Sequence, residues 1–429
     1  MIDAIVIGAG PAGSRVAGLL AKKGYQVTVL EDHVQAGDSV CCTGIVGAEC
    51  FGRLTTDAKV LSAPKSALFH SPGGRVIRLE KGTPQAYVLE RASLDRSLAQ
   101  QAQSDGARFI YGCSVEGAAR VNGHVEVDSV VGKSREVFSA RVVVLAAGFN
   151  PGLISRIGVG GIGDFAVGAQ VEADIVGVDE VEVGFSREFA PGFFTWIVPT
   201  GGGKALIGLI CRERPKQRLR AYLSHLRRQG KVRGDEFQIG SGRIPLKPSG
   251  KSYGDRLLAV GDAAGQVKPT TGGGIYYGLL CAEIAADVLD KAFRTDNLSA
   301  SELGAYQRRW RKALDAELSM GYLSRQVFER LGDRAIDTMF DIVKRYSLDK
   351  MALDSPGFSF DWHGGILRRA LNHAGVRATL GIALTGLWPN KSRKISGEPD
   401  IDDGIVFEGL DPGDVSPRVR PSEECAMRS

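Results

Sequence analysis

The sequence predicts an α/β fold with three parts: a parallel sheet covered by helices, a separate antiparallel sheet and a helical C-terminal region. Residues 4–30 read as strand, glycine-rich turn, helix and strand, which is how a parallel βαβ unit begins. Residues 166–210 hold four runs of alternating apolar residues, typical of antiparallel strands. Residues 301–345 show helical periodicity. These observations place two sheets of different kinds in one chain.

The order of the elements predicts a discontinuous first domain. An apolar run at 257–260 and a long helical pattern at 272–293 return the chain to the first sheet. We predict a Rossmann-like, dinucleotide-binding domain at 1–150 plus 246–295, an antiparallel β-sheet substrate domain at 60–90 plus 151–245, a helical region at 296–388 and a polar tail at 389–429. We also read residues 33–90 as turn-rich. Pro, Gly and Asp dominate the tail, which is typical of a loose terminal segment.

Composition excludes several classes of protein. The net charge of +5 is too small to indicate nucleic-acid binding. The seven cysteines form no Cys-x-x-Cys pair and have no metal-ligand spacing with the six histidines, so we predict no metal site and a reducing compartment. The N-terminus lacks a signal-peptide pattern, and no run reaches the roughly 20 apolar residues of a membrane-spanning helix. We therefore expect a cytoplasmic protein.

The first motif that carries chemistry is the turn Gly8-Ala9-Gly10-Pro11-Ala12-Gly13. Gly8 permits the tight turn, Gly10 lets the backbone approach a pyrophosphate, and Gly13 allows the helix to pack closely on the strand. The N-terminus of that helix then faces the phosphates with partial positive charge. Glu31 ends the next strand, where a carboxylate can accept hydrogen bonds from an adenosine ribose. The motif predicts a dinucleotide site without distinguishing FAD from NAD.

The second motif begins with an apolar strand and Gly261-Asp262-Ala263, and it continues with Lys268-Pro269-Thr270-Thr271-Gly272-Gly273-Gly274-Ile275 and a helix. This combination resembles the second FAD signature of the p-hydroxybenzoate hydroxylase superfamily, so it implies an FAD-binding domain of that type, the GR2 type. The resemblance implies that Asp262 binds the ribityl chain and that Gly272–Ile275 lie under the isoalloxazine. There the helix dipole would stabilise the negative charge of reduced flavin. The alternative for Asp262 is an ordinary helix N-cap.

A third motif, Arg91-Ala92-Ser93-Leu94-Asp95, resembles the Arg-x-x-x-Asp of the same superfamily, in which the arginine reaches the phosphate region of the cofactor. The alternative is a simple i,i+4 ion pair on a helix. Residues 142–148 resemble the strand that ends beside the cofactor. The predicted FAD-binding residues are Gly8, Gly10, Ala12, Gly13, Glu31, Asp32, Gly44, Arg91, Val115, Gly148, Gly261, Asp262, Gly272, Gly273, Gly274 and Ile275.

Further segments narrow the resemblance within the superfamily. The helix start Gly272–Gly278, the loop Cys41-Cys42-Thr43-Gly44, the strand Phe194-Thr195-Trp196-Ile197-Val198-Pro199 and the helix with Tyr306, Trp310 and Glu317 resemble the geranylgeranyl reductase family. The resemblance covers about residues 1–345 and implies saturation of isoprenoid double bonds. Phe194, Val198 and Ile210 depart from that family's substrate motif, which leaves the individual prenyl lipid open.

Two sets of residues are candidates for the substrate region. Phe194 and Trp196 alternate on a strand and can line one wall of a lipid pocket, to which we add Pro199 and Tyr276. The alternative is that both rings belong to the core. Cys41 and Cys42 are candidate catalytic residues, either as a proton donor or as a strained disulfide. The alternative for them is a small buried apolar residue.

The reaction that the resemblance implies is hydride transfer from reduced FAD to one alkene carbon and protonation of the other. With one dinucleotide fingerprint in the chain, we expect an external reductant, either NAD(P)H or a ferredoxin-like electron donor protein. A prenyl-lipid substrate favours peripheral membrane contact, for which residues 308–312 and 368–388 mix basic and apolar residues. The alternative for both segments is a solvated helix face.

Two other functions compete with this prediction. An FAD-dependent monooxygenase or halogenase of the same superfamily would share both glycine motifs. A non-catalytic prenyl-lipid carrier would have lost FAD binding, and the intact Asp262 and Gly272 loop argue against it.

Overall fold

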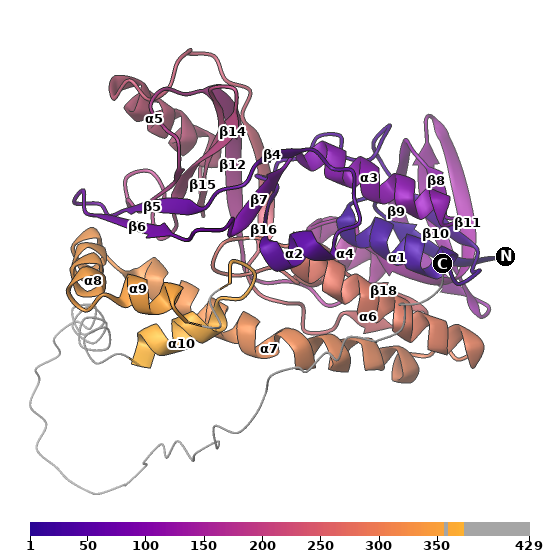
Figure 1. Cartoon of the computed structure of the whole chain (residues 1–429). Helices are drawn as coiled ribbons and strands as arrows, with labels where there is room; N and C mark the ends of the chain where they lie inside the picture. Colours follow the sequence, from indigo (N-terminus) through magenta and orange to yellow (C-terminus); the bar gives the residue numbers. More distant parts are fainter. Residues whose placement is uncertain (356–358, 373–429) are drawn as a thin grey trace, which may run out of the picture. The chain divides into compact units, whose positions relative to one another are not determined.

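A mostly parallel sheet has the strand order β17-β18-β11-β1-β2-β8, and its strands β8, β11 and β18 are labelled at the right of Figure 1. The strands are β1 (Ile2–Ile7), β2 (Val27–Leu30), β8 (Arg108–Ile110), β11 (Ser134–Leu145), β17 (Tyr253–Gly254) and β18 (Leu257–Ala259). All pair in parallel except β17, which is antiparallel to β18. The structure is a computed structural model that describes residues 1–355 and 359–372, and these belong to one compact unit.

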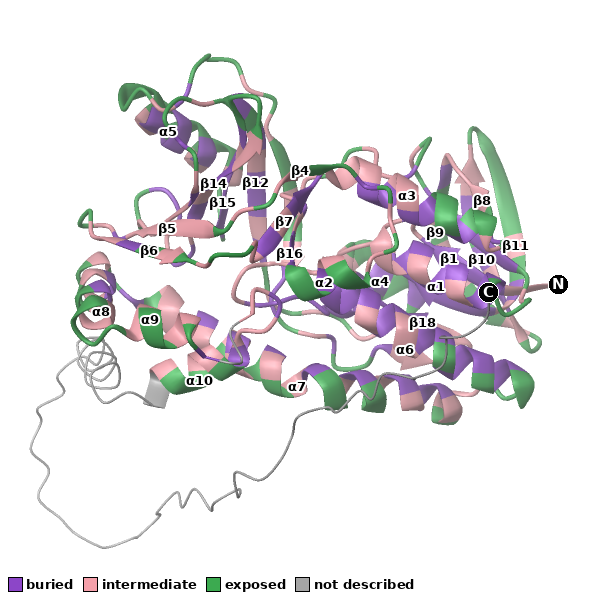
Figure 2. Cartoon of the chain, viewed as in Figure 1, coloured by how far each residue is buried: buried purple, intermediate pink, exposed green. Residues whose placement is uncertain are grey.

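Helices bury one face of this sheet. Helix α1 (Pro11–Ala21) packs against α3 (Arg91–Ser104) and α6 (Ile275–Arg294). The other face packs against α4 (Pro151–Ile157) and the strands β9 (Cys113–Val121) and β10 (His124–Val131), which extend β11 as an antiparallel meander. Because both faces are covered at the centre of the sheet, β2 and the C-terminal parts of β1 and β11 are buried, whereas the first residues of β11 are exposed, as Figure 2 shows.

The second sheet has seven strands in the order β16-β12-β15-β14-β13-β5-β6, antiparallel apart from the β13–β5 pair. Its strands are β5 (Ser66–His70), β6 (Val76–Glu80), β12 (Phe165–Asp174), β13 (Val181–Gly184), β14 (Thr195–Gly201), β15 (Lys204–Cys211) and β16 (Gly240–Pro245). Helix α5 (Pro215–Arg228) packs on it through four apolar residues: Leu219, Tyr222, Leu223 and Leu226. A small sheet of β3 (Ile45–Gly47), β7 (Ala86–Leu89) and β4 (Val60–Ser62), with helix α2 (Ala48–Arg53), joins the two regions.

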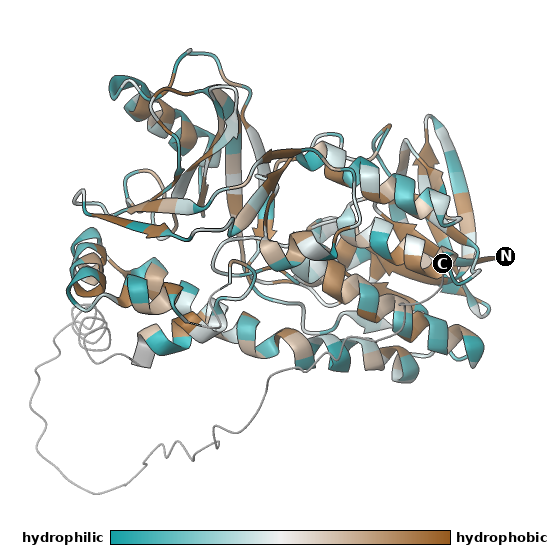
Figure 3. Ribbon diagram, viewed as in Figure 1, coloured by the Kyte–Doolittle hydropathy of each residue, from teal (hydrophilic) through white to brown (hydrophobic). Residues whose placement is uncertain are grey.

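The C-terminal helices return to both sheets. Helix α7 (Ala300–Arg330) buries Tyr306, which donates to the Ala259 carbonyl at 3.0 Å, and Trp310, which donates to Ser252 Oγ at 3.0 Å. Helix α8 (Asp333–Arg345) packs on β6 through Ile336 and Phe340. Helices α9 (Leu348–Leu353) and α10 (Gly364–Asn372) complete the described region. Hydrophilic and hydrophobic residues alternate along α7 and α8, as Figure 3 shows.

The predicted fold class is confirmed, with a mixed α/β architecture, an antiparallel sheet and a helical C-terminal region. The reading of residues 33–90 as turn-rich was incomplete, because turns and loops alternate there with the short strands β3–β7 and the helix α2. These strands are short and find partners in distant parts of the chain, so they have little local periodicity. The division into domains stays a prediction, and the predicted tail at 389–429 lies outside the described residues.

The membrane prediction loses part of its basis. Trp310, in the basic segment 308–312, has none of its surface exposed, so this segment offers no apolar face for a membrane. Residues 373–388 of the second segment are outside the described range. Across residues 1–355 and 359–372, every helix is too short or too polar to cross a bilayer.

Candidate functional site

A cavity of about 340 Å³ lies where the carboxyl ends of the parallel strands meet the seven-stranded sheet. One side is formed by the turn after β1, the start of α3 and the loop before α6. The other side is formed by β12, β14, β15 and β16, and residues 40–46 and 360–361 also line it. Such crevices beyond the carboxyl ends of parallel strands are where α/β proteins bind ligands.

The turn after β1 is built for close approach of a ligand to the backbone. Gly8 adopts φ +103°, and a Cβ on Gly13 would lie 2.0 Å from the Gly8 carbonyl oxygen. Gly10 has open space around the position of a Cβ and lines the cavity. The turn therefore holds the α1 N-terminus against the sheet and leaves room for a phosphate there.

Arg91 and Asp262, both half-buried, bring two opposite charges to the same cavity. Arg91 makes an ion pair with Asp95, and its buried Nε has no hydrogen-bond partner among the described residues. The Asp262 carboxylate likewise receives no hydrogen bond from them, and burial raises its pKa to about 6 while Arg91 opposes the shift. Buried polar groups are normally satisfied, so this donor and this acceptor are open to a ligand's phosphate and hydroxyl groups.

The loop before α6 closes this side of the cavity. Gly272 adopts φ +76°, and a Cβ on Gly274 would lie 2.4 Å from the Asp262 carboxylate. Helix α6 begins at Ile275, three residues later than predicted, so the glycines form the loop and Gly274 is the N-cap. The free N–H groups of this helix start face the cavity region with partial positive charge. Together with the open groups of Arg91 and Asp262, the site fits FAD.

Most predicted residues come together at this cavity. The lining includes Gly10, Ala12, Cys41, Cys42, Gly44, Arg91, Gly148, Trp196, Gly261, Asp262, Gly272, Gly273, Gly274, Ile275 and Tyr276. Gly8 and Gly13 lie behind it and shape the turn. Glu31, Asp32, Val115, Phe194 and Pro199 do not line it. Their assignments to the FAD and substrate sites stay predictions.

Glu31 lies behind the turn rather than in the cavity. Its carboxylate accepts a hydrogen bond from Ala9 N at 2.7 Å and is 2.8 Å from His33 Nδ1. Burial raises the pKa of Glu31, and the contact with Glu31 raises that of His33. The side-chain atoms of Glu31, Asp32 and His33 that could bind a metal ion lie within 4.8 Å of one another. Among the described residues, this is the one group of three such side chains that lie close enough together to share an ion. Val115 lies on β9 against the core of the other sheet face.

The opposite wall is formed by the seven-stranded sheet. Trp196 Nε1 and Thr43 Oγ1 both donate to Gln170 Oε1, at 3.3 and 3.0 Å. The indole lies over Gly208, where a Cβ would be 2.3 Å from the ring. Phe194 precedes β14 and packs on Trp196 with ring centroids 5.9 Å apart, behind the lining. Pro199 lies at the far end of β14, where its carbonyl accepts from Ser62.

Cys41 and Cys42 both lie in the lining as free thiols. Burial, followed by the neighbouring Cys42, raises the pKa of Cys41 to about 11. Cys42 Sγ accepts a hydrogen bond from Gly44 N at 3.4 Å. At neutral pH the Cys41 thiol is therefore protonated, which is the state that a proton donor needs.

Sequence reasoning missed the segment that closes the cavity, residues 359–364, here called the C-terminal strap. Phe360 and Asp361 line the cavity. The Asp361 carboxylate accepts from Gly47 N and Cys50 N, each at 3.1 Å, and so caps helix α2. His363 Nδ1 is 2.7 Å from Thr270 Oγ1. Local sequence gave no signal for the strap, because each contact joins residues more than 90 positions apart.

The strap also fixes Tyr276. The phenol donates to Glu49, which accepts a second bond from Trp362 Nε1 at 2.7 Å. The Tyr276 ring packs edge-on against Trp362 at 5.6 Å. Its hydroxyl is therefore occupied by protein contacts, and its predicted role toward substrate remains a prediction.

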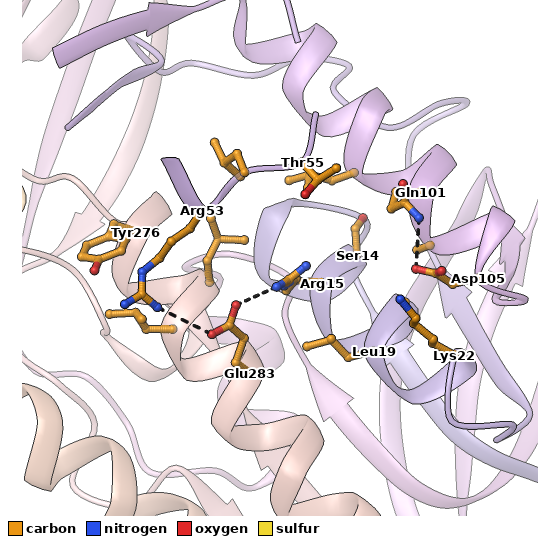
Figure 4. A pocket seen from close by; sticks show the side chains of 16 residues that line it. Ser14, Arg15, Leu19, Lys22, Arg53, Thr55, Gln101, Asp105, Tyr276 and Glu283 are labelled. Carbon is orange, nitrogen blue, oxygen red and sulfur yellow. Dashed lines mark hydrogen bonds and ion pairs between the residues drawn. The ribbon is translucent and has the colours of Figure 1, made fainter. Parts of the chain in front are cut away.

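A second pocket, of about 190 Å³, lies between α1, α2, α3 and α6. Figure 4 shows Arg15 and Arg53 pointing toward Glu283, at 2.7 and 4.0 Å. Gln101 donates to Asp105 at 3.3 Å on the far side. Tyr276 is the one predicted site residue in its lining. Because its arginines already have a carboxylate, the pocket offers less to an anionic ligand than the cavity does.

Comparison with known proteins agrees with this geometry. The lycopene cyclase protein family model matches residues 3–352. The chain is 30% identical over 366 residues to the digeranylgeranylglycerophospholipid reductase of Methanocaldococcus jannaschii, covering 82% of this chain and 92% of that protein. Its structure is similar to that of a geranylgeranyl bacteriochlorophyll reductase-like protein from Thermoplasma acidophilum, with a TM-score of 0.77, 22% identity, and 89% and 98% of the chains covered. A variant of the halogenase PltM in complex with FAD has a TM-score of 0.62, with 14% identity and 91% and 92% covered.

Proposed function

The chain belongs to the geranylgeranyl reductase family of FAD-dependent enzymes, and we propose that it saturates C=C bonds of a polyprenyl lipid by flavin hydride transfer and protonation. The observation that carries the proposal is the shared cavity. It has a glycine and Arg91–Asp262 cradle on one side and an apolar wall with Trp196 on the other. The named relative acts on a prenylated glycerophospholipid, and this supports a lipid substrate here.

Bound and reduced FAD supplies the hydride. The chain's own residues do the rest. Arg91 and the α1 N-terminus would hold phosphate, Asp262 would accept from a ribityl hydroxyl, and the Gly272–Gly274 loop would leave room for the ring system beside the α6 N-terminus. Trp196 and Phe360 would pack against an apolar chain and so orient the alkene in the cavity.

Cys41 is the proposed proton donor to the second alkene carbon. Its thiol lines the cavity, and its raised pKa keeps the proton in place until transfer. Cys42, adjacent in the lining, is the control for this assignment; its Sγ accepts a hydrogen bond from Gly44 N. We expect Cys41→Ala to slow turnover at least tenfold and Cys42→Ala to slow it little. Full turnover by both variants would remove the thiol from the mechanism.

The test of the function begins with the absorption spectrum of the purified protein. Dithionite reduction under argon is followed by addition of a polyprenyl lipid. Oxygen-free reoxidation of the flavin and a gain of two mass units per reduced bond in the lipid are the expected results. Reoxidation that requires oxygen would instead support the monooxygenase or halogenase, whose solved relatives share the fold.

The external reductant is part of the proposal. Either NAD(P)H or a ferredoxin-like protein would re-reduce the flavin, and stopped-flow reduction with each donor distinguishes them. The faster donor at equal concentration would be assigned.

Peripheral membrane contact is proposed through helix α5 rather than through α7. Helix α5 contains no Asp or Glu and turns its apolar residues to the sheet. Its exposed cations are Lys216, Arg220, Arg227 and Arg228. Each basic residue near an anionic bilayer contributes about 1 kcal/mol. Flotation with anionic but not with neutral liposomes is expected, and equal flotation with both would contradict it.

A further inference from the structure

Lys268 joins the glycine loop of the cavity to the C-terminal strap. Its backbone N–H donates to the Gly273 carbonyl at 3.0 Å, and its carbonyl accepts from Gly272 N at 2.9 Å. Its side chain passes beside Gly273, where an added Cβ would lie 3.5 Å from Lys268 Cε. The ammonium then donates to the Phe360 carbonyl at 2.9 Å. The backbone of Lys268 therefore hydrogen-bonds to the glycine loop, and its charged side chain hydrogen-bonds to the strap.

The charge of Lys268 is buried and only partly compensated. The residue is 5% exposed and lines the cavity. Its nearest carboxylate, Asp361, is 3.7 Å away, beyond direct hydrogen bonding, and is 1% exposed. The Asp361 oxygens are already bonded to Gly47 N and Cys50 N. The two opposite charges therefore stay distinct, and each acts on the cavity through a medium in which charges are weakly screened.

We propose that Lys268 and Asp361 set the reduction potential of the flavin, Lys268 raising it and Asp361 lowering it. Reduction leaves negative charge on the flavin, so a buried cation beside the glycine loop favours the reduced form and a buried carboxylate favours the oxidised form. Burial lowers the pKa of Lys268 while Asp361 opposes this shift, so the pair also helps to keep the lysine charged. The inference rests on FAD binding in the proposed function and not on the identity of the lipid.

The experiment measures the midpoint potential of the FAD-loaded protein by anaerobic reduction against a reference dye. Lys268→Met is expected to shift the ratio of reduced to oxidised flavin about tenfold toward oxidised, which is about 30 mV for a two-electron couple. Asp361→Asn is expected to shift it in the opposite direction. Lys268→Arg keeps the charge and should keep the potential. Arg309→Gln, which removes an exposed cation of α7 that pairs with Asp287 of α6, is the control for a remote charge and should not change the potential.

Potential shifts in opposite directions distinguish an electrostatic role from a structural one, because loosening the strap would shift the potential of both variants in the same direction. Shifts in the same direction, or no shift in either variant, would overturn the proposal. If Lys268→Met fails to fold, Lys268→Gln and Asp361→Asn still test whether the two charges shift the midpoint potential in opposite directions. A wild-type protein that holds no FAD would also overturn it. The expected shifts without any lipid reduction would leave this inference standing and refute the proposed function instead.

Discussion

The two sides of the cavity are built in different ways. On the cofactor side, the wall is formed mainly by backbone. Gly8 and Gly272 have positive φ, and the surroundings of Gly13 and Gly274 leave no room for a side chain at either position. On the opposite side, the wall is formed by side chains from segments that are distant in the sequence. Trp196, Gln170 and Phe360 come from two strands and the strap.

This difference explains why the sequence predicted more of one side than of the other, where it identified Trp196 but neither Gln170 nor Phe360. A backbone cradle needs glycines at fixed spacing, and such spacing is visible in a linear sequence. A wall of side chains needs only apolar residues that meet after folding, and many segments satisfy that requirement. The cofactor side should therefore tolerate few substitutions, while the opposite wall should respond gradually.

The largest effect on FAD binding is expected from a methyl group on the cofactor side. Gly274→Ala places a Cβ 2.4 Å from the Asp262 carboxylate, so the loop or the carboxylate must move. Overpacking costs about 1–3 kcal/mol, which corresponds to FAD binding weakened by about 5- to 150-fold. Titration of the FAD-free protein with FAD measures this. Gly52→Ala, in helix α2 with open space around it, is the matched control and should bind FAD normally. Equal affinities in both would contradict the cradle.

A second prediction is that the charge of Asp262 lowers the stability of the FAD-free protein but favours FAD binding. The pKa of Asp262 is raised to about 6 by burial, so between pH 4 and 6 the folded protein holds a proton that the unfolded chain releases. The stability of the FAD-free protein should thus fall as pH rises through this range, and the loss is complete above it. Asp262→Asn should stabilise the FAD-free protein at pH 7 by roughly 2–3 kcal/mol while weakening FAD binding.

Urea unfolding at pH 7 and 4.5 checks this, with Asp361→Asn as the control. The Asp361 carboxylate is bonded to two backbone N–H groups, so its replacement should cost about 1 kcal/mol of stability. If Asp262→Asn destabilises the FAD-free protein at pH 7, the charge of Asp262 is satisfied and the fit to a ribityl hydroxyl loses its support.

The strap should show the opposite dependence on pH. Burial, followed by the charge of Lys268, lowers the pKa of His363 to about 4. Between pH 6.5 and 4 the unfolded chain binds a proton that the folded protein does not, so stability should fall with falling pH across this window. His363→Gln should flatten that part of the profile by up to about 3 kcal/mol. Melting temperatures of the two proteins between pH 7 and 4 test it, and parallel profiles would exclude His363 as the cause.

The smallest effect is expected on the sheet wall. Trp196→Ala should lower kcat/KM for the lipid about tenfold, or about 1.4 kcal/mol, without changing FAD affinity. Phe194→Ala is the control, since Phe194 lies behind the lining and should have a weaker effect. A larger loss of kcat/KM for Phe194→Ala than for Trp196→Ala would support the prediction that both rings contact the substrate.

The sequence by itself determined the cofactor side of this protein. The spacing of Gly8, Gly10 and Gly13, the Gly261-Asp262 step and the glycine loop before α6 are local patterns, because each constrains backbone that is contiguous in the chain. Only the tertiary structure decided the rest. It placed Phe194 and Pro199 outside the lining of the cavity, turned Trp310 into the core and brought the strap onto Lys268. Those outcomes depend on pairings between residues far apart in sequence, which no local pattern encodes.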